Sequence, residues 1–245
     1  MSLRQGAVVS CLFLISGANV ALAQSARKEP RTAVGVQIGI DPVVAGQIVH
    51  GRAVSHPSTI ERVSDLSFGD VYRQAWRIGG EVSRAIDQTV DVLARLSYTQ
   101  ARSRGPVELR EVTYYPYRST TITTFSDYRT MTIEGGLRFQ FGSLGAVRPS
   151  VGLVGGLSII QRITIDPPVT LPASNTLLAR AVVPTFGVIA GASFAVRPTL
   201  HLCVETGLRF QAEPDSGSTG DYYVDHGLDG SRLSVPLVGT VQFRF

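Results

Sequence analysis

The charged residues of this sequence recur at a spacing that places them on one face of a β-strand. The clearest examples are two similar hexapeptides, EGGLRF at 134–139 and ETGLRF at 205–210, in which Glu and Arg are four residues apart. In a strand this spacing puts both side chains on the same face about 13 Å apart, which is too far for a pair within one strand. We therefore expect these charges to pair with charges on other strands.

Neighbouring segments carry similar charges, which together would form a crossed network of ion pairs inside a closed sheet. The predicted network is Arg77, Glu81, Asp91, Arg95, Glu134, Arg138, Glu205 and Arg209. A barrel of eight strands has an interior just wide enough for side chains. The network is therefore compatible with a polar structural core or with a narrow pore, and we favour the structural core.

Catalytic chemistry has little support. His201, Cys203 and Glu205 share one predicted face, but a spacing of about 3.3 Å per residue is too long for a direct dyad in an extended strand. The acidic segment 213–230 has no EF-hand or nonapeptide spacing, so a solvated loop is favoured over a calcium site. We expect no catalytic residue, no metal and no cofactor.

Six further arginines fall at the predicted strand ends that face long connections. They are Arg102, Arg104, Arg129, Arg162, Arg180 and Arg232. Guanidinium groups bind phosphate in a bidentate manner, so this rim is a candidate contact for the phosphates of lipopolysaccharide, with ordinary solvation as the alternative. No basic block stands out, and we expect no nucleic-acid partner.

Long alternating segments would position these residues. Seven of them follow residue 71, at 75–85, 89–100, 128–141, 149–162, 179–196, 199–212 and 232–245, and 32–40 supplies an eighth. The connections alternate between short ones (87–88, 142–147, 197–198) and long ones (102–126, 163–178, 213–230). This pattern predicts an antiparallel up-and-down barrel with its short turns at one end. Residues 41–70 show no clean period.

The last strand, RLSVPLVGTVQFRF, has apolar residues at nearly every second position and ends on Phe245. It resembles the terminal strand of bacterial outer-membrane β-barrels, and the resemblance implies that Val241, Phe243 and Phe245 form a signal for the barrel assembly machinery. Aromatic residues near strand ends, with Trp76 and Tyr128 beside long loops, predict two girdles at the membrane interfaces. From about residue 71, and less closely from 32, the chain resembles the small OmpA-like, eight-stranded family.

Residues 1–23 have the pattern of a secretory signal. Arg4 precedes an apolar stretch at 7–16, and Ala21-Leu22-Ala23 matches the small-x-small cleavage site. We expect Sec-dependent export and cleavage before Gln24, followed by an N-terminal segment at 24–70 and the barrel at 71–245. Cys203 would then be the only cysteine left, which excludes an intrachain disulfide.

Taken together, these features predict an all-β, antiparallel, up-and-down transmembrane barrel, with eight strands, in the outer membrane of a Gram-negative bacterium. The resemblance implies a non-enzymatic protein with a structural, adhesive or envelope-integrity role, whose partners are outer-membrane lipids and lipopolysaccharide. A narrow porin-like channel is the second hypothesis and a lipid-modifying barrel enzyme the third. A soluble secreted barrel with its apolar face inward is the remaining class.

Overall fold

The computed structural model describes residues 32–49, 51–114, 116–142, 146–166, 176–214 and 230–245. The predicted signal at 1–23 and most of the acidic segment 213–230 lie outside the described residues. None of the described residues forms a helix long and apolar enough to cross a membrane.

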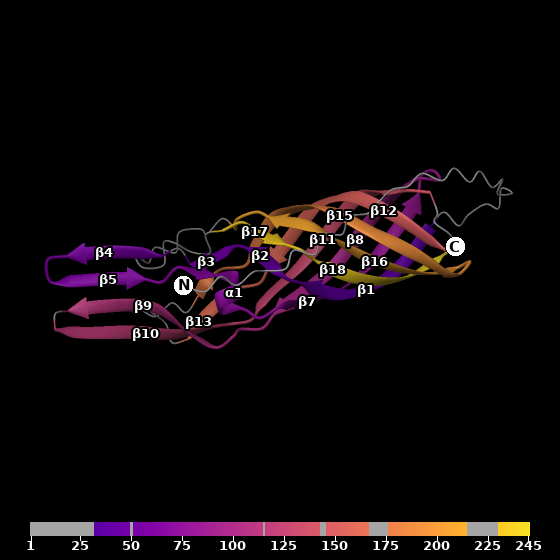
Figure 1. Ribbon diagram of the computed structural model, residues 1–245. Helices are drawn as coiled ribbons and strands as arrows, with labels where there is room; N and C mark the ends of the chain where they lie inside the picture. The colour runs from indigo at the N-terminus through magenta and orange to yellow at the C-terminus, as the bar shows by residue number, and fades with distance from the viewer. Residues whose placement is uncertain (1–31, 50, 115, 143–145, 167–175, 215–229) are drawn as a thin grey trace, which may run out of the picture.

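Eight strands close into an antiparallel barrel, drawn on the right of Figure 1. In order around the wall they are β1 (Thr32–Asp41), β7 (Ala75–Ala85), β8 (Val90–Ala101), β11 (Tyr128–Gln140), β12 (Val147–Ile160), β15 (Ala181–Arg197), β16 (Leu200–Gln211) and β18 (Leu237–Arg244). Each strand pairs with the next, and β18 pairs with β1 from Ala33↔Arg244 to Ile40↔Leu237. The predicted fold class is confirmed, and 32–40 does supply a strand.

The segment predicted as one terminal strand at 232–245 is interrupted. It consists of β17 (Arg232–Ser234) and β18, separated by Val235 and Pro236. Proline has no backbone N–H to donate to the ladder, which accounts for the break. On its other edge, β17 pairs with β2 (Val43–Ala45), so the wall continues past the proline.

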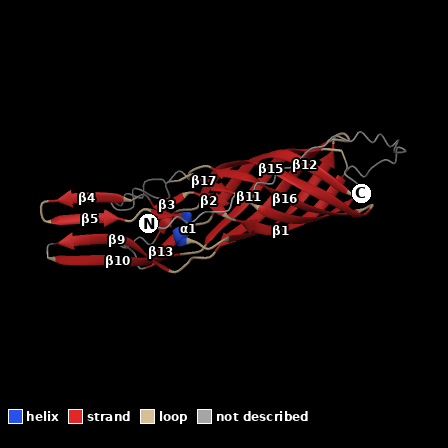
Figure 2. Cartoon of the chain, in the orientation of Figure 1, coloured by secondary structure: helices blue, strands red, loops and turns tan. Residues whose placement is uncertain are grey.

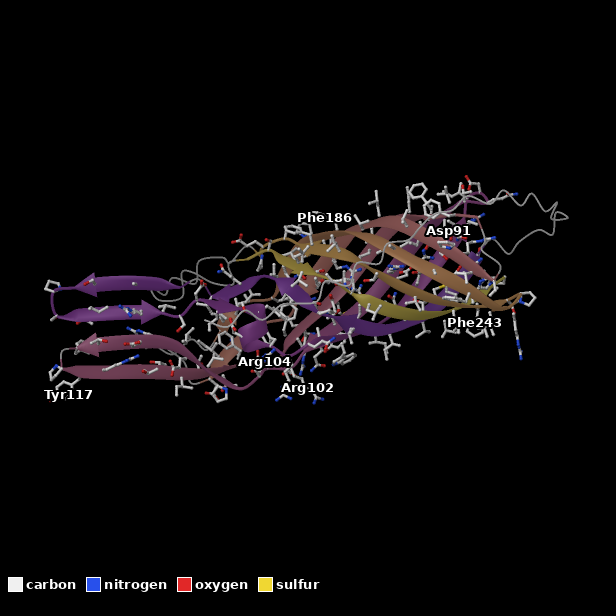
Figure 3. All side chains as sticks on the ribbon, viewed as in Figure 1. Asp91, Arg102, Arg104, Tyr117, Phe186 and Phe243 are labelled. Carbon is white, nitrogen blue, oxygen red and sulfur yellow. The ribbon has the colours of Figure 1, made fainter. Side chains whose placement is uncertain are left out.

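Side chains alternate between the interior and the outer surface of the barrel along every strand. On β1, Val36 and Ile38 are 65% and 67% exposed, whereas Gln37 between them is 2% exposed. Apolar groups therefore cover the outside and polar groups fill the inside, with Phe186 and Phe243 outside and Asp91 inside in Figure 3. This is the inverse of a soluble barrel and matches a wall that faces lipid.

Two hairpins extend from the barrel at the end opposite the short turns (Figures 1 and 2). They are β4 (Arg52–His56) with β5 (Thr59–Val63), and β9 (Pro106–Tyr114) with β10 (Tyr117–Phe125). With β13 (Ile163–Asp166) and β14 (Thr176–Leu178) they form one sheet in the order β14-β13-β10-β9-β5-β4. We call the β4–β5 and β9–β10 hairpins the blade. The segment 102–126 connects two barrel strands, as predicted, but it contains the strands β9 and β10.

Between the blade and the barrel lies a small layer formed by β3 (Gln47–Val49), β6 (Leu66–Ser67) and α1 (Phe68–Val71). The Ser67 hydroxyl accepts the Asp70 N–H at 3.3 Å, while the Asp70 carboxylate accepts the Ser67 N–H at 2.9 Å. This reciprocal capping box satisfies donors at the start of α1 and directs Phe68 and Val71 into the interior. Within 41–70, which had no clean period, β3, β6 and the start of α1 therefore help to close one end of the barrel, while β4 and β5 belong to the blade.

Candidate functional site

Four charged side chains form a closed ring across the middle of the lumen. Arg95 donates from Nε to Oε2 of Glu81 at 2.7 Å and also pairs with Glu205. Arg138 lies 2.9 Å from Glu81 and 2.6 Å from Glu205. Each arginine therefore contacts both carboxylates, and the charges balance. We call this set the lumen ring.

A second charged layer lies beside the ring, toward the blade. Glu134 accepts from Arg209 at 2.7 Å and from Arg77 at 3.3 Å, and Arg77 also donates to the Ser97 hydroxyl at 2.6 Å. All three charged side chains are less than 10% exposed. Opposite charges contact one another in both layers, which offsets part of the cost of burying them.

The two similar hexapeptides pair with each other in a crossed manner. Arg138 of the first contacts Glu205 of the second, and Glu134 of the first contacts Arg209 of the second. The crossing arises because β11 and β16 run in opposite directions. The spacing of four residues thus serves two layers at once, with one pair in each layer.

Between the two layers, three strands have a glycine on the inward face. Gly79 separates Arg77 from Glu81, Gly136 separates Glu134 from Arg138, and Gly207 separates Glu205 from Arg209. A Cβ added at these glycines would lie 2.4, 2.2 and 2.0 Å from a carbonyl oxygen of the adjacent strand. The strands therefore approach more closely than a side chain permits. This requirement was not recognised in the sequence, although the repeated charge-x-Gly-x-charge pattern is visible there.

Asp91, the eighth member of the predicted network, lies apart from both layers. It faces inward near the short-turn end, where its carboxylate accepts from the Gln140 side chain. Gln140 in turn accepts from Arg148 at 3.0 Å. Seven of the eight predicted residues therefore meet in the two layers, while Asp91 belongs to a separate polar group.

Arg232 does not lie on the rim, contrary to the prediction. It is 7% exposed, points inward and lies 3.4 Å from Asp41. Its guanidinium group lies over the rings of Phe68 and Tyr128, 4.8 and 5.1 Å from their centroids. Arg232 therefore joins the charged interior to the layer that closes the barrel. The sequence contained a signal for this inward orientation, because Arg232 is two residues from the inward Ser234 and therefore lies on the same face of the strand.

An apolar cluster closes the barrel at its blade end, and we call it the apolar cap. Its buried members are Ile48, Val49, Leu66, Phe68, Val71, Tyr72, Ala75, Ala101, Leu109, Phe125, Tyr128, Ile160, Ile163, Ile165, Leu177, Leu178 and Val183. They come from β3, β6, α1, the base of the blade and the inward ends of barrel strands. Ion pairs thus occupy the middle of the lumen, and hydrocarbon side chains occupy its blade end.

The other five predicted rim arginines are exposed near the blade end of the barrel. They are Arg102, Arg104, Arg129, Arg162 and Arg180. Figure 3 labels Arg102 and Arg104 at this level, where both lie at the edge of the barrel. The Arg104 side chain is held against the protein, because its Nε donates to the Tyr72 carbonyl at 2.9 Å. Arg73, which was not predicted, is exposed beside Arg102.

Most aromatic residues of the predicted girdles are exposed on the outer surface, but Tyr128 is not. Trp76 is 40% exposed and packs against Tyr98, with ring centroids 5.6 Å apart. Tyr128 is 4% exposed and belongs to the apolar cap, because it shares the inward face of β11 with Thr130. The residues of the predicted assembly signal, Val241, Phe243 and Phe245, are 41%, 56% and 69% exposed on the outer surface.

The histidine and cysteine of the predicted inward face lie on β16. His201 and Cys203 face inward on β16, near the short-turn end, and Cys203 is buried. Within the described ranges, no three His, Cys, Asp or Glu side chains are arranged to hold a metal ion.

Comparison with known proteins gives a likeness in fold. No family model and no curated protein matches the sequence. Among solved structures, Neisserial surface protein A has a TM-score of 0.48 at 15% identity, covering 87% of this chain and 97% of that chain. The attachment invasion locus protein Ail of Yersinia pestis, in complex with the heparin analogue sucrose octasulfate, has a TM-score of 0.43 at 9% identity, covering 88% and 99%.

The outer-membrane protease OmpT of Escherichia coli is also similar, with a TM-score of 0.46 at 8% identity, covering 91% of this chain and 99% of that chain. The names of these neighbours state different roles, so no activity follows from the likeness. The closed strand order, the inward charges and the outward apolar surface define the fold independently. The chain has the fold of a small, eight-stranded outer-membrane β-barrel.

Proposed function

We propose that this protein is a non-enzymatic, non-conducting barrel of the bacterial outer membrane that has a structural or adhesive role at the cell surface. The observation that carries the proposal is the filled interior. The lumen ring crosses the barrel at mid-height, and the apolar cap lies above it. Because side chains occupy the lumen at both of these levels, a rigid support is favoured over a channel.

A role outside the membrane is supported by the blade. Its strands pair from Thr59↔Tyr114 across to Tyr114↔Tyr117, so the two hairpin ends lie side by side far from the barrel (Figure 3). Tyr114 and Tyr117 are 54% and 75% exposed there. Exposed tyrosine is common at binding surfaces because it offers a large, stiff contact with one polar atom.

The absence of an enzymatic role is supported by the state of the inward carboxylates. Glu81, Glu134 and Glu205 each contact two arginines inside the barrel. A general acid or base needs a carboxylate with access to a substrate. Inside the barrel, these carboxylates contact arginines of the same chain.

Conductance in planar lipid bilayers tests the proposal against a porin-like channel. The refolded protein should insert without producing stepwise currents in concentrated KCl, and a general porin added afterwards should produce them in the same membrane. Reproducible unitary steps from the protein alone would favour the channel. Attachment of cells to host surfaces, measured with and without the distal blade, then separates an adhesive role from a structural one.

A further inference from the structure

We propose that one side of the barrel binds the phosphate groups of lipopolysaccharide through an arc of five arginines. The arginine arc consists of Arg73, Arg102, Arg129, Arg162 and Arg180, at the blade ends of β7, β8, β11, β12 and β15. These are five consecutive strands of the wall. The inference rests on the proposed membrane location and adds a ligand class and a side of the molecule.

Backbone pairing fixes the arc as a continuous feature. The Arg73 N–H donates to the Arg102 carbonyl at 2.8 Å, and the Gln161 N–H donates to the Arg129 carbonyl at 2.9 Å. Gln100 is directly opposite both Trp76 and Arg129 in the ladder. These pairings join the strands that carry Arg73, Arg102 and Arg129 to one another and to Gln161 of the next strand.

The next row of outward side chains toward the short turns is apolar. Register pairs Tyr98 with Ile78 and with Met131, and pairs Ile159 with Met131 and with Val182. The change from arginine and glutamine to hydrocarbon thus takes place within one row. Such a boundary marks the level at which acyl chains end and lipid headgroups begin. The adjacent rings of Trp76 and Tyr98 mark the same level.

Hydrogen bonds and an ion pair hold part of the arc in place. The Asp127 carboxylate accepts from the Gln100 amide at 2.8 Å and from the Ser103 N–H at 3.3 Å, and lies 3.5 Å from Arg129. Partial burial alone would raise the pKa of Asp127, but these hydrogen bonds hold it below its ordinary value. Asp127 is the counter-charge within the arc. Arg162 donates to the Thr176 hydroxyl at 2.8 Å.

The opposite side of the barrel differs at this level. At the blade ends of β16, β17 and β1, the described residues include one arginine, Arg232, which is buried against the apolar cap. Glu213, also among the described residues there, is exposed. A phosphorylated lipid would therefore meet bidentate donors on the β7–β15 side and an acidic group on the other.

The test uses the mature protein refolded in a non-ionic detergent. Trp76 is the single tryptophan and lies next to Gln100, so its emission reports on the arc. Lipopolysaccharide should change this emission in a saturable manner. Dephosphorylated lipopolysaccharide should bind at least about tenfold more weakly, because it lacks the charged groups that accept hydrogen bonds from the guanidinium groups. Inorganic phosphate alone should not compete; competition at similar concentration would mean a simple anion site.

A matched pair of variants separates the arc from general charge. Arg129→Gln/Arg180→Gln removes two exposed arginines from the arc, and Arg84→Gln/Arg197→Gln removes two from the short-turn end. We expect at least about tenfold weaker binding in the first and less than twofold change in the second. Equal loss in both, or no loss in the first, would overturn the inference. If the protein refolds and its band shifts on gels, but its binding does not depend on the phosphate groups, only this inference is wrong. If the protein is soluble without detergent, the membrane proposal is wrong as well.

Discussion

At the scale of single residues, the interior is organised by shared partners. Glu81 and Glu205 each contact Arg95 and Arg138, and Gln242 also donates to Glu81 at 2.8 Å. Because every member has two opposite neighbours, loss of one leaves two charges under-compensated. The ring is therefore strongly coupled, and a second substitution can restore the balance of charge that the first removed.

We predict that Glu205→Gln lowers the free energy of unfolding by about 3–5 kcal/mol, because Arg95 and Arg138 would then share one carboxylate. The double variant Glu205→Gln/Arg138→Met should be more stable than the single variant, since it leaves one balanced pair. Urea unfolding from lipid vesicles, followed by Trp76 emission, measures both. Glu111→Gln, which removes an exposed pair with Arg118, should cost less than about 1 kcal/mol. A lower free energy of unfolding for the double variant than for the single variant would contradict this account of the lumen ring.

Two adjacent glycines provide a second residue-level prediction. Gly136→Ala should destabilise the barrel by about 1–3 kcal/mol, because its Cβ would meet the Leu153 carbonyl oxygen at 2.2 Å. Gly135→Ala should change stability by less than about 0.5 kcal/mol, since its nearest neighbour would be 3.8 Å away. The same unfolding experiment compares them. Equal effects would show that the close approach of β11 and β12 is unimportant.

Odd and even positions along a strand lie on opposite faces. This alternation explains which inward residues were predicted correctly and which were misassigned. The charged face was predictable because Glu and Arg recur at even spacing. Arg232 and Tyr128 were misassigned because they were placed by their distance from a loop instead of by the face they share with Ser234 and Thr130. Asp41 and Gln242 carried no comparable signal, since their roles depend on residues from other strands.

At the scale of elements, the eight wall strands were predictable because one face is apolar and the other polar. The blade was not, because its distal strands lack a consistent apolar face. In β10, for example, the run Arg118–Thr121 is polar at every position and gives no alternation of polarity. The cap was missed for a different reason. Its apolar residues come from several short elements, and only the tertiary fold brings them together.

The terminal strand gives a prediction about assembly. Phe243 and Phe245 are exposed on the outside, so they add little to the packing of the folded barrel. Phe243→Ala/Phe245→Ala should refold in detergent with the wild-type yield but accumulate to a lower level in the outer membrane of cells, because the residues act as a recognition signal. Refolding assays and fractionation measure the two effects. A normal level in cells would remove the predicted role.

The blade gives a prediction about modularity. Replacing 53–62 and 111–120 with short glycine-serine turns removes the distal strands but keeps Leu109 and Phe125, which belong to the apolar cap. The trimmed barrel should refold with wild-type stability, since the lumen ring and cap remain. Unfolding midpoints of the trimmed and full proteins test this. A large drop in the midpoint would mean that the blade is part of the cooperative unit.

At the scale of the whole molecule, a closed wall encloses two charged layers and an apolar cap, and a blade extends from the capped end (Figure 1). Closure leaves the wall without free edges, which a lipid environment requires because backbone groups there have no water to pair with. The outside is apolar over the height of the wall, and on the β7–β15 side exposed arginines follow at the blade end. These features together support a membrane barrel that acts through its outer end.

The central claim is that the chain forms a closed barrel in the outer membrane with its charges inside. Membrane fractions run on SDS gels with and without boiling test it most directly, because a closed barrel resists the detergent until it is heated. We predict that the protein is found in the outer-membrane fraction and that its band shifts on boiling, with Glu205→Gln shifting at a lower temperature. A protein found in the periplasm, with a single band under both conditions, would contradict the account.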